Sequence, residues 1–212
     1  MNKMCRTNTQ SGRSMIEMLG VLAIIGVLSV GGIAGYSKAM MKYRINKTID
    51  QVTQISQNVR TLYARYKQYR NLNERIAYKA NLAPKEMFYM ASRGVYDMTN
   101  DWGGFFSVHS TGFDVKSFTV ETWNLPNEAC IELATQDWGN LDTTGLISVS
   151  VSNGDVSDIP TEDDLVGNCS GKIGNGYAIA CSGGSVVSIP MPVEVAVDAC
   201  GNNRGNIMWI FQ

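Results

Sequence analysis

The chain has 212 residues, of which 44% are hydrophobic and 17% are charged, and its formal net charge is −1. That length suits one domain with an appendage, and the composition excludes wholesale disorder. A single histidine, His109, excludes most histidine-based metal sites and histidine-activated nucleophiles. The net charge sums two unlike parts: residues 1–93 hold 15 Lys/Arg and 4 Asp/Glu, whereas residues 94–212 hold 3 and 15. This division predicts two parts with different roles.

An apolar run of twenty residues without a charge extends from Met18 to Ser37. At about 1.5 Å per residue, a helix of this length matches the thickness of a bilayer core. Three interpretations are open: a secretory signal peptide cut at residues 32–34, an N-terminal anchor, or a short leader cut before the run. The run is longer than the usual apolar core of a signal peptide and passes without a break signal into an amphipathic helix, which favours the short leader.

The residues before the apolar run carry the informative pattern. Gly12 is followed by Arg13, and Glu17 lies at the edge of the run, where a carboxylate is costly unless it is paired. The order Gly-Arg-Ser-Met-Ile-Glu, followed by an uninterrupted apolar helix, resembles the class III signal of type IV pilins. The resemblance implies that a prepilin peptidase cuts after Gly12, that the new amine at Arg13 is methylated, and that Glu17 pairs with a neighbouring subunit's amine during assembly. The absence of a proline in the helix resembles the type IVb branch, which includes conjugative thin-pilus pilins.

Beyond the apolar run, a stripe at helical spacing predicts an amphipathic stem. Apolar residues recur every seven positions, with a second set three positions later: Ile45, Val52, Val59 and Tyr66, then Ile55, Leu62 and Tyr69. We expect a leader at 1–12, one helix over 13–70 with a membrane part at 13–37 and a stem at 38–70, and a globular head at 71–212. Tyrosines and basic residues interleave from Arg60 to Arg75, but a helix edge with snorkelling side chains has the same pattern, and nucleic acid is not the partner we expect.

The amino-acid composition changes in the second half of the chain, because 15 of the 21 glycines follow Arg93. Short runs rich in β-branched and aromatic residues, separated by Gly, Asn and Asp, predict strands at 105–108, 117–123, 146–152, 177–181, 193–197 and 207–211. Residues 84–92 and 125–138 are predicted to be helical. The expected fold class is α+β, with a long N-terminal helix packed on an antiparallel-sheet head that contains disulfides.

Four cysteines lie outside the predicted leader: Cys130, Cys169, Cys181 and Cys200. They lack the C-x-x-C spacing of zinc sites. In a secreted head they predict two disulfides with three possible connectivities. We expect Cys130–Cys200, which ties the C-terminal segment to a helix, and Cys169–Cys181, which closes a Gly-rich hairpin. In type IVb-like pilins a disulfide similarly bounds a C-terminal region. Disulfides form in an oxidising space, so the C-terminus is expected outside the cytoplasm.

No pattern predicts catalysis or a cofactor. Gly171-Lys172 lacks phosphate-loop spacing, and the acidic run at 155–164 lacks EF-hand spacing, so we expect a solvated loop, no metal and no enzymatic activity.

The resemblance implies a structural subunit of a type IVb-like pilus. It is expected to span the inner membrane with its C-terminus in the periplasm, and then to polymerise with identical subunits into an extracellular pilus. The implied partners are the prepilin peptidase/methylase, the inner-membrane assembly machinery, and a host or recipient cell surface in adhesion, aggregation or conjugation. The alternatives are a minor pilin or type II secretion pseudopilin and, from another class, a membrane-anchored periplasmic enzyme or binding protein.

Overall fold

The computed structural model describes residues 15–66, 68–92, 94–111, 115–154, 169, 171–201 and 204–212. The chain divides into two compact units, Met1–Tyr43 and Arg44–Gln212. Helix α1 (Met15–Tyr63) belongs to the first unit up to Tyr43 and to the second from Arg44 onward. We call the second unit, Arg44–Gln212, the head unit.

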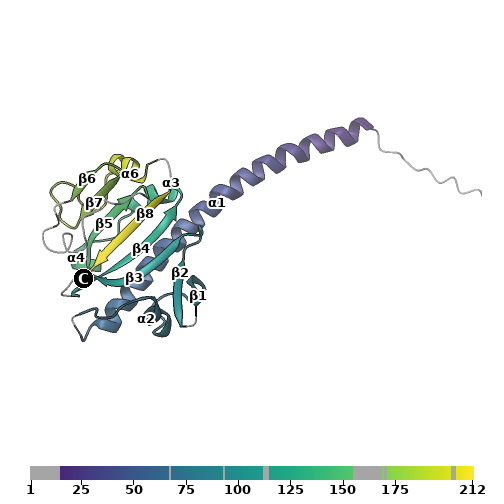
Figure 1. Cartoon of the computed structure of the whole chain (residues 1–212). Helices are drawn as coiled ribbons and strands as arrows, with labels where there is room; N and C mark the ends of the chain where they lie inside the picture. Colours follow the sequence, from purple (N-terminus) through teal and green to yellow (C-terminus); the bar gives the residue numbers. More distant parts are fainter. Residues whose placement is uncertain are drawn as a thin grey trace, which may run out of the picture. The chain divides into compact units, whose positions relative to one another are not determined.

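An antiparallel sheet of eight strands forms the centre of the head unit, in the order β1-β2-β3-β4-β8-β5-β7-β6 (Figure 1). The strands are β1 (Phe88–Ser92), β2 (Val95–Thr99), β3 (Phe105–Thr111), β4 (Ser117–Leu125), β5 (Leu146–Ser152), β6 (Lys172–Gly174), β7 (Tyr177–Cys181) and β8 (Gly205–Phe211). The last strand, β8, lies between β4 and β5, so that Trp209 is opposite Val120 on one side and Val149 on the other. The C-terminal segment is therefore central to the sheet.

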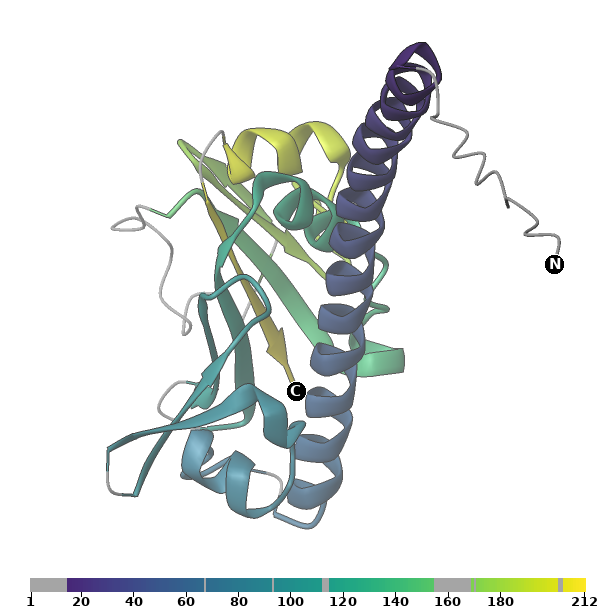
Figure 2. The ribbon, with the colours of Figure 1, turned by 90° about the vertical axis from the view of Figure 1, so that its right-hand side faces the viewer.

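Among the described residues, five short helices accompany the sheet: α2 (Glu74–Lys79) and the 3-10 helix η1 (Lys85–Met87) before β1, and α3 (Asn127–Thr135), α4 (Leu141–Thr144) and α6 (Val193–Cys200) between strands. Figure 2 shows α3, α6 and residues 44–63 of α1 on the same face of the sheet. The residues that α1 buries completely are Ile45, Val52, Ile55 and Val59. Burial of one such side chain contributes about 1.5–3 kcal/mol, so this stripe fixes the second half of α1 in the core of the head unit.

Helix α1 ends at Tyr63, seven residues before the predicted end at residue 70. Tyr69 is held away from the helical path, because its backbone N–H donates to the Val115 oxygen (2.7 Å) and its ring lies 4.7 Å from the ring of Phe118. The stripe predicted from the sequence is buried only as far as Val59, and Tyr66 is 74% exposed.

The segment 193–197, predicted as a strand, is the start of helix α6. Its alternating valines fit a strand, but the buried side chains are Ala196, Ala199 and Cys200, which recur with helical spacing. Pro192 stands at the N-cap position, where its missing N–H costs nothing.

The segment 84–92, predicted as a helix, is instead the 3-10 turn η1 followed by strand β1. Phe88 and Tyr89 favour extended structure, and their strand is completed by pairing with Met98 and Asp97 of β2. The remaining architecture agrees with the expected α+β class: a long N-terminal helix, an antiparallel sheet and two disulfides.

Candidate assembly and anchoring site

Within the described part of the chain, no residue covers the apolar part of α1. Every large apolar side chain between Met15 and Tyr36 is exposed, from 43% at Met18 to 83% at Met15. The helix is long and apolar enough to cross a membrane, with a mean hydropathy of 2.2 in its most apolar window. A helix that is apolar on all sides is stable only when lipid or other protein surrounds it. This surface is therefore the candidate site for anchoring and for assembly.

Glu17 lies in the first turn of α1, where the helix dipole favours an anion. The two serines of the apolar run are satisfied within the helix, because Ser29 Oγ donates to the Ile25 oxygen (2.7 Å) and Ser37 Oγ to the Ile33 oxygen (3.0 Å). Among the residues that the structure describes, the Glu17 carboxylate has no partner. Gly12 and Arg13 lie outside the described residues.

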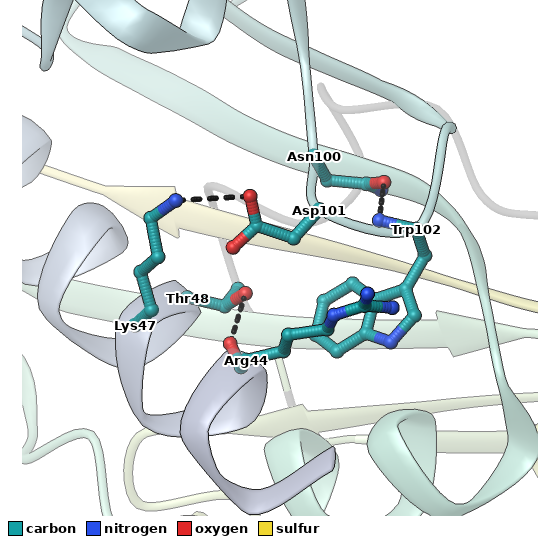
Figure 3. A network of polar contacts seen from close by, with 6 residues as sticks. All are labelled: Arg44, Lys47, Thr48, Asn100, Asp101 and Trp102. Carbon is teal, nitrogen blue, oxygen red and sulfur yellow. Dashed lines mark hydrogen bonds and ion pairs between the residues drawn. The ribbon is translucent and has the colours of Figure 1, made fainter. Parts of the chain in front are cut away.

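A polar network holds the start of the head-unit part of α1 against the turn between β2 and β3 (Figure 3). Lys47 Nζ lies 2.9 Å from Asp101 Oδ1, and each side chain is 29% exposed. Within α1, Thr48 Oγ1 donates to the Arg44 oxygen (3.0 Å). The network joins the start of the head-unit part of α1 to the turn between β2 and β3, close in sequence to Tyr43, where the first unit ends.

Asn100 organises this turn from within. Its Nδ2 donates to Thr122 Oγ1 (2.9 Å) and to the Trp123 oxygen (2.7 Å), while its Oδ1 accepts from the N–H groups of Trp102 (3.0 Å) and Gly104 (2.8 Å). A Cβ atom at Gly104 would overlap the Trp123 carbonyl, so only glycine fits there. Sequence reasoning missed this network. The available signal was the turn composition of residues 100–104, which does not reveal that α1 is its partner.

The tyrosines of the basic segment after Val59 are engaged in packing. The ring of Tyr63 lies 5.4 Å from that of Tyr69 and 6.4 Å from that of Tyr66. Burial raises the pKa of Tyr63, and it also raises the pKa of Tyr69, against a smaller lowering by the Arg60 charge. Arg60 Nη1 donates to the Thr144 oxygen (2.7 Å). Most of the interleaved aromatic residues thus serve the fold of the head unit.

Two disulfides tie the second half of the head unit together. Cys130 of α3 is bonded to Cys200 of α6 with a Cα–Cα distance of 6.0 Å, and Cys169 is bonded to Cys181 of β7 with a Cα–Cα distance of 5.7 Å. These are the two pairs that we selected from the sequence. The second closes the β6–β7 hairpin, and the first links two helices that cover the sheet.

The other sequence candidates do not form a reactive centre. His109 Nε2 lies 3.8 Å from Glu121 Oε1 on neighbouring strands. The acidic run at 155–164 lies outside the described residues. Within the described part of the chain, no group of three or more His, Cys, Asp or Glu is arranged to hold a metal ion.

Comparisons with known proteins give one family and a shared fold. A family model described as PilS N terminal matches residues 42–183, more than half of the chain. The structure of TcpA, a type IV pilin from Vibrio cholerae El Tor biotype, is similar with a TM-score of 0.50 and 13% identity, covering 80% of this chain and 99% of that one. The type IVb pilin from Salmonella typhi has a TM-score of 0.48 and 13% identity, with 77% and 97% covered. No curated protein matches the sequence.

Proposed function

Because this chain belongs to the type IV pilin family described as PilS N terminal, we propose that it is the prepilin of a type IVb-like pilus. After removal of residues 1–12, the subunit is held in the inner membrane by residues 13–37. It then enters a surface filament of identical subunits through the same helix. The observation that carries this proposal is the exposure of every large apolar side chain between Met15 and Tyr36 in a member of a family of structural subunits.

The same apolar surface of α1 serves the subunit in the membrane and in the filament. In the membrane, lipid surrounds the helix, and in the filament the helices of neighbouring subunits take its place, so the transfer leaves little apolar area in water. The two disulfides support a head unit on the oxidising side of the membrane, with the C-terminus in the periplasm before assembly. The filament then acts in adhesion, aggregation or conjugative transfer, with a host or recipient cell surface as partner.

Glu17 supplies the register in this proposal. A carboxylate in a membrane helix costs up to about 2.5–3.5 kcal/mol at the helix centre, Glu17 lies at the edge of the apolar run, and an ion pair offsets the cost only when its geometry is good. The methylated amine of Arg13 on a neighbouring subunit is the proposed partner. Pairing rewards the one stagger of helices that brings the two charges together, whereas apolar contacts alone tolerate many staggers.

Mass spectrometry of the mature N-terminus tests the processing. We expect a chain that begins at Arg13 and carries one added methyl group on its amine, both in the membrane fraction and in sheared filaments. An intact Met1, or a start near Gly35, would contradict the proposal and favour an anchored periplasmic protein or a secreted one. Dominance of the chain in sheared filaments distinguishes a major pilin from a minor pilin or a pseudopilin.

Glu17→Ala tests the register. We expect the variant to be processed, to form both disulfides and to remain in the membrane, but to be absent from sheared filaments. Glu17→Gln should fail in the same way, because it keeps the shape and loses the charge. Glu86→Ala, at an exposed acid of the head unit, is the matched control and should assemble normally. Normal piliation by Glu17→Ala would show that the carboxylate has no role in register.

A further inference from the structure

A cavity of about 260 Å³ lies in the head unit where β2 and β3 separate. The two strands pair at only two positions, Met98↔Phe106 and Thr99↔Phe105, whereas β3 and β4 stay paired as far as Thr111. The cavity is lined by Glu74, Asp97, Met98, Phe105, Phe106, Ser107 and Trp123. None of these lining residues belongs to α1 or to a disulfide. A ligand site here does not depend on the proposed role in a filament.

Two exposed aromatic rings form one side of the cavity. Phe105 is 56% exposed and Trp123 is 48% exposed. Their ring centroids lie 6.4 Å apart with an interplanar angle of 85°, an edge-to-face arrangement that leaves ring faces available to a ligand. Trp123 Nε1 donates to Glu121 Oε2 (3.2 Å), which orients the indole and uses its donor. The walls therefore offer π faces and no spare indole N–H.

The polar side chains that line the cavity include two carboxylates, which carry negative charge and accept hydrogen bonds. Asp97 Oδ2 accepts from Tyr89 Oη (3.3 Å), and the Glu74 carboxylate has no partner among the described residues. The Ser107 hydroxyl lies 3.5 Å from Glu121 Oε2 and is directed to it. Among the residues that the structure describes, the lining includes no Lys, Arg or His. A ligand that brings positive charge would complement these groups.

We propose that this cavity binds an organic cation through the ring faces of Phe105 and Trp123 and the carboxylates of Glu74 and Asp97. Aromatic faces attract an ammonium or guanidinium group electrostatically, and the two carboxylates that line the same cavity add Coulombic attraction. A neutral sugar would also stack on the rings and donate its hydroxyls to the carboxylates, but it would leave their negative charge uncompensated. The charge of the ligand is thus the property that the lining selects.

Choline and its neutral isostere 3,3-dimethylbutan-1-ol test the proposal directly, since they differ in charge and hardly in shape. The full chain in dodecyl maltoside micelles, labelled with ¹⁵N, gives one indole N–H signal for each of its four tryptophans. We expect choline to shift the signal of Trp123 with a dissociation constant of about 1–10 mM, while the isostere binds at least about tenfold more weakly. The signals of the buried Trp138 and Trp209 should stay in place and report an intact fold.

Paired variants assign the effect to the cavity. Glu74→Gln with Asp97→Asn should weaken choline binding about five- to tenfold, because two exposed ion pairs are lost. Glu194→Gln with Asp198→Asn removes the same charge from α6 and should leave binding unchanged. Phe105→Ala should weaken it about two- to fivefold.

Three results would each overturn the proposal. They are equal shifts by choline and its isostere, equal weakening by the two charge-neutralised pairs, and a Trp123 shift by N-acetylglucosamine but not by choline. The last result would identify a carbohydrate site in place of a cation site.

Discussion

Asn100→Ala should destabilise the head unit strongly, because four hydrogen bonds of one buried side chain disappear together. Asn100 is 7% exposed, and it links the turn after β2 to strand β4. Its Oδ1 also accepts hydrogen bonds from two backbone N–H groups of its own turn. The same turn carries Asp101, whose carboxylate pairs with Lys47 of α1. The truncation therefore also loosens the attachment of α1.

The size of the loss follows from the burial of the partners. Each hydrogen bond contributes about 0.5–1.5 kcal/mol net, and a buried polar group left without a partner costs about 1–3 kcal/mol. Gly104 and Thr122 are buried, so water does not replace Asn100 at either of them, whereas Trp102 N–H and the Trp123 oxygen are only partly buried. The sum is about 3–5 kcal/mol, a large share of the roughly 5–15 kcal/mol that stabilises a typical domain.

Urea unfolding of the non-reduced full chain in micelles measures this loss. All four tryptophans lie in the head unit, so their fluorescence follows its unfolding and is insensitive to the apolar part of α1. Asn206→Ala is the matched control, because its Oδ1 accepts one exposed hydrogen bond, from the Asn124 N–H (3.0 Å). That control should lose about 0.5–1 kcal/mol. A loss below about 1.5 kcal/mol for Asn100→Ala, or equal losses for both variants, would refute the assignment of Asn100 as the buried anchor of the turn.

Two further predictions concern the disulfides and alkaline pH. Replacing Cys130 and Cys200 by serine should cost more than replacing Cys169 and Cys181, because the first bond closes a loop with a sequence separation of 70 and the second one of 12. The chain-entropy relation gives about 4.4 and about 2.8 kcal/mol, and thermal unfolding of the two double variants checks the order, which reversed losses would contradict. Burial raises the pKa of Tyr69 above its ordinary value of 10.0, so the unfolded chain ionises first. The corresponding stability is present below pH 10 and is lost as pH rises through the folded-state pKa, and Tyr69→Phe should flatten the fall in unfolding free energy above pH 10. Parallel pH curves for both proteins would refute that contribution.

Local sequence patterns predicted the parts of the fold that local chemistry decides. Strands β5 and β7 begin and end at the predicted residues, because these short apolar-rich runs are bounded there by Gly, Asn or Ser. The apolar run and the start of the buried stripe at Ile45 are likewise visible in residue spacing alone. Short segments such as 193–197 were ambiguous, because five residues satisfy a period of 2 as readily as one of 3.6.

The candidate functional residues likewise divide into those that the sequence reveals and those that only the structure reveals. Glu17 was identifiable from its position before an apolar helix, since a carboxylate there is unusual in any structure. Asn100 and Asp101 looked like an ordinary turn, because their importance lies in contacts with β4 and α1 that residue spacing does not encode. The aromatic cavity between β2 and β3 was invisible for the same reason.

The sequence by itself therefore determined that this protein has an apolar N-terminal helix long enough to span a membrane, an acidic second half and a set of cysteines that predicts disulfides, because hydropathy, charge and cysteine content are properties of the chain. Only the tertiary structure decided that the last strand, β8, lies between β4 and β5 and brings Trp209 opposite Val120 and Val149. That choice depends on which distant segments bury each other best once the chain closes its loops. It is a property of the packed core and cannot be read from any single segment.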